Sequence, residues 1–130
     1  MPKNFKKRRD KDMRYTEFKV GDKEYKLRLA ANEMINIEKK INANVLDIFM
    51  KKEQIPTMEE LLLVLHGSLQ KFHHGISLSD VYKIYDDYVD EGGGFEELIE
   101  VIVDVFEVSG FFKKEDIEEG KKEIEEKKNK

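Results

Sequence analysis

The chain has 130 residues, of which 40% are charged and 39% hydrophobic, and a formal net charge of −4. This length corresponds to one domain with one core, and the lack of cysteine excludes disulfides, thiolate metal sites and cysteine nucleophiles. No apolar run approaches the ~20 residues of a membrane span, and the basic N-terminus lacks the apolar segment of a signal peptide. We therefore expect a cytoplasmic protein.

The N-terminal residues 1–14 differ in charge from the rest of the chain. They carry seven Lys or Arg and two Asp, a local charge of +5, whereas the remainder is −9. Such an asymmetry can mark an arm that binds nucleic acid. The arm has one aromatic residue, Phe5, and adjoins no basic folded surface, so we favour a disordered, solvated terminus.

Residues 15–29 have the alternating pattern of a β-hairpin, because apolar side chains alternate with mostly charged ones. Two loop lengths would keep the apolar side chains of both strands on one face of the hairpin. A four-residue loop pairs Val20 with Tyr25 and Phe18 with Leu27, whereas a two-residue Gly-Asp loop pairs Phe18 with Tyr25. Since a lone hairpin is only marginally stable, its apolar face must pack on helices or pair with another chain.

Helical patterns follow from residue 31. A helix is predicted over 31–41, a break over 42–44 and a short helix over 45–49. A capping box of Thr57 and Glu60 begins the core helix, whose apolar stripe runs from Met58 to Phe72. Gly67, inside this helix, either permits the close approach of another helix or is merely tolerated.

Two amphipathic helices flank a triple-glycine break at residues 92–94. Ser77 or Ser79 caps the first helix. Its predicted apolar face consists of Val81, Ile84, Tyr85, Tyr88 and Val89. The second helix runs from Phe95 to the stop at Ser109-Gly110. The sequence thus predicts a mainly α protein with a small N-terminal β-hairpin (α+β), a compact bundle of about four to five helices over 15–112, and a charged mobile tail over 113–130.

The sequence has no pattern typical of catalytic or metal-binding chemistry, so we expect neither an enzyme nor a metal or cofactor site. His73 and His74 are adjacent and diverge by about 100° on a helix, and His66 is two turns from His73, so a zinc site is disfavoured. A histidine at a helix end or bonded in the core is the simpler interpretation. The acidic residues before the glycines fail the EF-hand spacing. No phosphate loop or nucleophile motif is present.

A helix ending in His-His-Gly-Ile-Ser, a Val-Tyr-x-Ile-Tyr-Asp-Asp-Tyr helix, an acidic-glycine turn and a helix closing on Ser-Gly-Phe follow one another in order. From about Tyr15 to Phe111, the chain resembles the tail assembly chaperones of phages and prophages of Gram-positive bacteria. The resemblance implies a protein without catalytic activity or a metal. It also implies a role in binding the tape measure protein and keeping it soluble, with the tail tube protein and further copies of the chain as additional partners.

Three surfaces are candidates for binding a client: the hairpin edge, part of the core-helix face and the aromatic end of the last helix. The partner-binding residues are predicted to be Phe18, Val20, Leu62, Leu69, Phe111 and Phe112. Ordinary core packing is the competing interpretation at each position. The alternative functions are a small nucleic-acid-binding or regulatory domain that uses the basic arm, which the acidic body disfavours, and a structural virion subunit whose hairpin augments a sheet.

Overall fold

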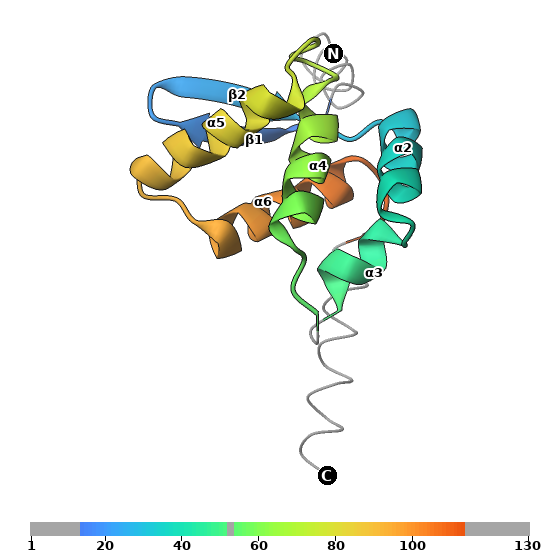
Figure 1. Ribbon diagram of the computed structural model, residues 1–130. Coiled ribbons are helices and arrows are strands. Elements are labelled where there is room, and N and C mark those ends of the chain that lie inside the picture. Colours follow the sequence, from blue (N-terminus) through green and yellow to red (C-terminus); the bar gives the residue numbers. More distant parts are fainter. Residues whose placement is uncertain (1–13, 52–53, 114–130) are drawn as a thin grey trace, which may run out of the picture.

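The computed structural model describes residues 14–51 and 54–113 and has the α+β fold that the sequence predicts (Figure 1). Within these residues, an antiparallel hairpin precedes five helices. The predicted basic arm, except Arg14, and the predicted charged tail, except Lys113, lie outside the described residues. In the described part of the chain, no helix has both the length and the apolar character needed to cross a bilayer.

Strands β1 (Thr16–Val20) and β2 (Lys23–Leu27) pair through the two-residue Gly-Asp loop. Phe18 lies opposite Tyr25, so of the two predicted loops the shorter is confirmed and the four-residue loop is wrong. Gly21 takes a φ of 63°, which an L side chain rarely adopts, and this tight turn sets the register. The apolar face of β1 packs on α5 and α6, and β2 contacts α4, so helices of the same chain cover the hairpin.

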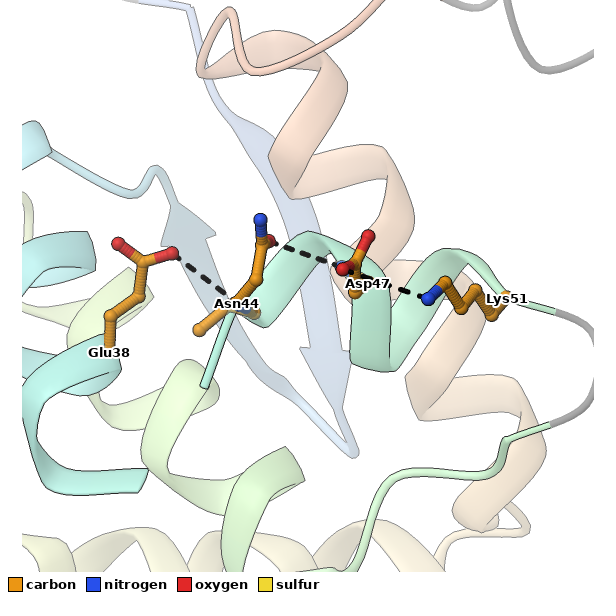
Figure 2. A network of polar contacts seen from close by, with 5 residues as sticks. Glu38, Asn44, Asp47 and Lys51 are labelled. Carbon is orange, nitrogen blue, oxygen red and sulfur yellow. Dashed lines mark hydrogen bonds and ion pairs between the residues drawn. The ribbon is translucent and has the colours of Figure 1, made fainter. Parts of the chain in front are cut away.

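Helix α2 (Ala31–Ile41) has the predicted bounds and ends at Asn42, whose φ is 54°. Helix α3 (Val45–Met50) begins one turn later. Figure 2 shows how the two are joined: the Val45 backbone N–H donates to Glu38 Oε2 at 3.5 Å, and the Asp47 N–H donates to Asn44 Oδ1 at 3.3 Å. Asparagine thus caps the helix that follows the predicted break.

Helix α4 (Met58–Leu69) forms the centre of the molecule and contacts α2, α5, α6 and β2 (Figure 1). Both bonds of the predicted capping box are present between Thr57 and Glu60. The helix ends at Leu69 rather than at Phe72, which corrects the predicted end. Gln70 explains the stop, because its side-chain amide donates to the carbonyl oxygens of His66 and Ile76 and closes the chain into a turn.

Helices α5 (Leu78–Asp90) and α6 (Phe95–Val108) flank the glycine break as predicted. Ser77, rather than Ser79, is the N-cap of α5, and Asp80 completes a capping box. One prediction for α5 is wrong: Val89 is 44% exposed. The reason is geometric, since eight residues at 100° each place Val89 about 80° around the helix from Val81, at the border of the buried face.

Candidate functional site

A groove of about 390 Å³ lies between the first turns of α4 and the middle of α5. Its lining comes from two short rows of side chains, which are Met58, Glu59 and Leu62 on α4 and Tyr82, Tyr85 and Asp86 on α5. Residues at i, i+3 and i+4 share one face of a helix, so each row is a ridge and the groove lies between the two ridges.

Local sequence sets the position of both ridges. The capping box of Thr57 and Glu60 places the N-cap of α4 one residue before Met58, and the capping box of Ser77 and Asp80 places the N-cap of α5 five residues before Tyr82. Reciprocal side-chain bonds of this kind satisfy backbone N–H groups that would otherwise lack partners. Both helix starts, and therefore the positions of the two ridges, are set by capping residues that lie within five sequence positions of the groove lining.

Two large apolar side chains of the groove remain accessible. Met58 is 42% exposed and Tyr82 is 48% exposed, although the prediction placed Met58 on the buried stripe. Leu62, one turn beyond Met58, is only 4% exposed and lines the groove from the core side. The groove therefore continues the hydrophobic core to the surface at the N-terminal end of α4.

The charges around the groove are acidic. Glu59 and Asp86 lie in its lining, and both are exposed. Tyr88 follows Tyr85 by one turn of α5. Burial is the main cause that raises its pKa, and the carboxylates of Glu97 and Glu100 raise this pKa further. Residues 77–112 carry ten Asp or Glu and one basic residue, Lys83, a net charge of −9. The tyrosine row of α5, which consists of Tyr82, Tyr85 and Tyr88, thus lies in a strongly negative part of the molecule.

The structure buries most of the residues predicted to bind a client. Phe18 and Val20 are 2% and 6% exposed, and Leu69 is fully buried, so these three side chains belong to the core. At these three positions the competing interpretation of core packing holds, because helices of the same chain cover the apolar face of the hairpin. Leu62 is equally buried but, of these four, it alone lines the groove.

Phe111 and Phe112 are half-buried and pack against the core at the end of α6. The Phe111 ring meets Phe106 edge to face, with 6.4 Å between the centroids, and its N–H donates to the Phe106 carbonyl at 2.9 Å. The two phenylalanines close the bundle beside α6. They are not among the residues that line the groove.

The predicted hairpin edge makes hydrogen bonds at the C-terminal end of β2 and in the residue just after it. The Lys26 N–H donates to His73 Nε2 at 2.9 Å, and the Arg28 N–H donates to the Ser68 carbonyl at 2.9 Å. His73 is therefore bonded, as one of the two predicted roles requires, but it is half-buried rather than in the core. Within residues 14–51 and 54–113, no group of three or more His, Cys, Asp or Glu has the geometry to hold a metal ion.

Sequence reasoning missed most of the groove, in particular Tyr82 and Asp86. A usable signal existed for Tyr82: it is a large aromatic residue outside the apolar face predicted for its helix, where a surface position would ordinarily be polar. Asp86 gave no such signal, because acidic residues are frequent throughout this part of the chain.

Fold and groove together define a small, acidic α+β protein with an accessible apolar groove between two helices. The chain belongs to the family described as Family of unknown function (DUF6096), which it matches over residues 11–129. Neither a curated protein nor a solved structure matches the chain.

Proposed function

We propose that this protein is a phage tail assembly chaperone that binds the tape measure protein and keeps it soluble during tail assembly. The sequence resemblance over residues 15–111 supports the role. The groove between α4 and α5 is the observation that carries it, because a chaperone needs apolar surface that is accessible before its client arrives. A protein in this role works in the bacterial cytoplasm and catalyses no reaction.

The distribution of apolar residues supports this proposal over sheet augmentation. Hairpin residues Phe18 and Val20 are buried on helices of the same chain, and the β2 edge bonds to His73. Ile35, Met58, Tyr82 and Val89 are instead exposed on helices, and Met58 and Tyr82 of these line the groove. Binding of a helical client segment in a groove is the mode that fits these surfaces.

Co-expression tests the proposal directly. The chain is produced together with the large helical protein expected to be encoded just downstream, and the soluble fraction of that protein is measured with and without the chain. We expect the client to become soluble and to co-purify with the chain. A client that is equally soluble alone, or that never co-purifies, would overturn the proposal. Detection of the chain in purified phage particles would favour a virion subunit instead.

A further inference from the structure

The groove between α4 and α5 has two properties that together restrict what it can hold: an apolar floor and an acidic rim. Met58, Leu62, Tyr82 and Tyr85 contribute the apolar surface, and Glu59 and Asp86 contribute the carboxylates. An apolar segment without charge would leave these carboxylates unpaired at the interface. An acidic segment would be repelled by them, since like charges brought together across an interface are unfavourable.

The α5 ridge is longer than the groove itself. Tyr82, Tyr85 and Val89 are spaced at i, i+3 and i+7, and Tyr82 and Val89 are both almost half exposed. Seven residues of α-helix span about 10.5 Å, or two turns. This length and spacing match the apolar stripe of another helix, whose side chains recur at the same intervals.

The surroundings of the tyrosine row extend the negative charge beyond the rim. Glu97 and Glu100 on α6 act on Tyr88, which follows Tyr85 by one turn. Lys83, the basic residue of this region, lies beside Asp80 and Asp87 in a different depression and does not line the groove. A partner that carries Lys or Arg would therefore meet several carboxylates and two exposed or half-buried tyrosine rings, which also attract cations.

We propose that the α4–α5 groove binds a basic amphipathic helix of the client, with apolar residues at i, i+3 or i+4 and i+7 inserted between the ridges and Lys or Arg side chains paired with Glu59 and Asp86. This inference rests on the proposed function, because it names the client segment that such a chaperone holds. The apolar contacts supply the area of the interface, and the charge pairs select basic segments over acidic ones.

Peptides of about 20 residues that tile the co-expressed client test the inference, with binding to the full chain measured by fluorescence anisotropy. The peptides that bind are expected to be basic and amphipathic. Met58→Ala combined with Tyr82→Ala should weaken their binding about tenfold or more, as loss of central aromatic contacts does. Ile35→Ala is the matched control, because Ile35 is 50% exposed on α2, outside the groove.

The charge requirement is tested separately. Glu59→Gln combined with Asp86→Asn should weaken binding of the basic peptides and flatten its dependence on salt, since exposed charge pairs are screened by ions. Glu17→Gln combined with Asp104→Asn removes the same charge from exposed positions outside the groove and should leave binding unchanged. Equal effects of the two pairs would mean a general attraction and would overturn the site.

Failure of this inference and failure of the proposed function give different results. If the client is solubilised but the groove variants bind it as the wild type does, the groove assignment is wrong and the function stands. If no client is solubilised, binding of an 18-residue Leu/Lys amphipathic peptide and its Leu/Glu counterpart to the full chain tests the groove alone. Binding of the Leu/Lys peptide in preference to the Leu/Glu peptide would support the groove assignment, and equal binding of both would overturn it. Wild-type dimers that dissociate on Tyr82→Ala, measured by light scattering, would show that a second copy fills the groove and overturn the inference.

Discussion

At the scale of single residues, His73 connects the hairpin to the turn after α4. Its Nε2 accepts the Lys26 N–H at 2.9 Å, and its ring meets Tyr25 edge to face at 5.3 Å between centroids. An imidazole that accepts at Nε2 must be unprotonated there. Burial, followed by the nearby Lys26 charge, lowers the pKa of His73 in the folded protein.

This lowered pKa predicts a stability loss in acid. The unfolded chain takes up the proton near the ordinary histidine pKa of about 6.5, above the folded value, so stability is full above that pH and falls as the pH drops below it. Urea unfolding at about pH 7.5 and about pH 5.5 measures the loss. His73→Gln keeps an acceptor without titrating and should lose less stability than the wild type.

His74→Gln is the matched control, because His74 is exposed and adjacent in sequence. It should retain the wild-type difference between the two pH values. A wild-type loss that His73→Gln does not reduce would mean that the carboxylates, and not the bond from Lys26 to His73, dominate the acid sensitivity. Asp80, whose pKa is lowered by the Ser77 backbone and side-chain bonds, is common to all three proteins and cancels in the comparison.

At the scale of elements, the turn between α5 and α6 depends on the glycine at its centre. A Cβ built on Gly93 would lie 2.4 Å from two carbons of the Tyr88 ring. That ring is held in turn by Phe18, with 4.9 Å between centroids, so it cannot move away without disturbing the hairpin contact. The glycine run therefore allows the α5–α6 turn to pass directly over the aromatic contact between α5 and β1.

Gly93→Ala is expected to destabilise the protein by about 1–3 kcal/mol, the usual cost of overpacking. Chemical denaturation monitored by circular dichroism measures the change. In a Tyr88→Leu background the same substitution should cost less than half as much, because the obstructing ring is absent. Equal costs in both backgrounds would show that backbone conformation, and not the Tyr88 ring, requires glycine here.

Gly67 presents a related case on α4. A Cβ there would lie 2.9 Å from Ile37 Cδ1 and 3.1 Å from Leu29 Cδ1. Of the two interpretations that the sequence left open, close approach is confirmed. The neighbours are the ends of flexible side chains, so Gly67 tolerates addition of a methyl group better than Gly93, where an aromatic ring blocks the space.

At the scale of the whole molecule, α4 is the common partner of the other elements. Its residues Leu61, Val64, Leu65 and Leu69 are fully buried, and the helix contacts α2, α5, α6 and β2. Because one helix joins both halves of the bundle, we expect the hairpin and the helices to unfold together rather than in stages.

Leu65→Ala tests this arrangement. The substitution leaves a cavity at the centre of the core and should cost about 2–5 kcal/mol, with unfolding curves from circular dichroism and tyrosine fluorescence still coincident. Ile35→Ala, at a half-exposed position on α2, should change stability by no more than about 0.5 kcal/mol. Separate curves for the two signals would contradict a single cooperative core.

Features that depend on near neighbours in the chain were predictable. The capping box of Thr57 and Glu60, the break at residues 42–44 and the glycine stop after α5 each act within one helical turn, so short sequence patterns are enough to place them. The α+β class and the bounds of α2 follow from the same periodicities. The end of α4 was predicted wrongly. The apolar stripe continues to Phe72, but the Gln70 side chain bonds to the Ile76 carbonyl in the loop, and the stripe gives no sign of this contact.

By itself, the sequence determined the kind and order of the elements, the acidic character of residues 77–112 and the sides of the helices that are apolar. Only the tertiary structure decided which apolar residues are covered. Met58 and Leu62 belong to one stripe, yet one is 42% exposed and the other 4%. The physical reason is that burial depends on which element packs against each turn of the helix. For α4 that element is α5, whose groove residues lie 20 or more positions further along the chain.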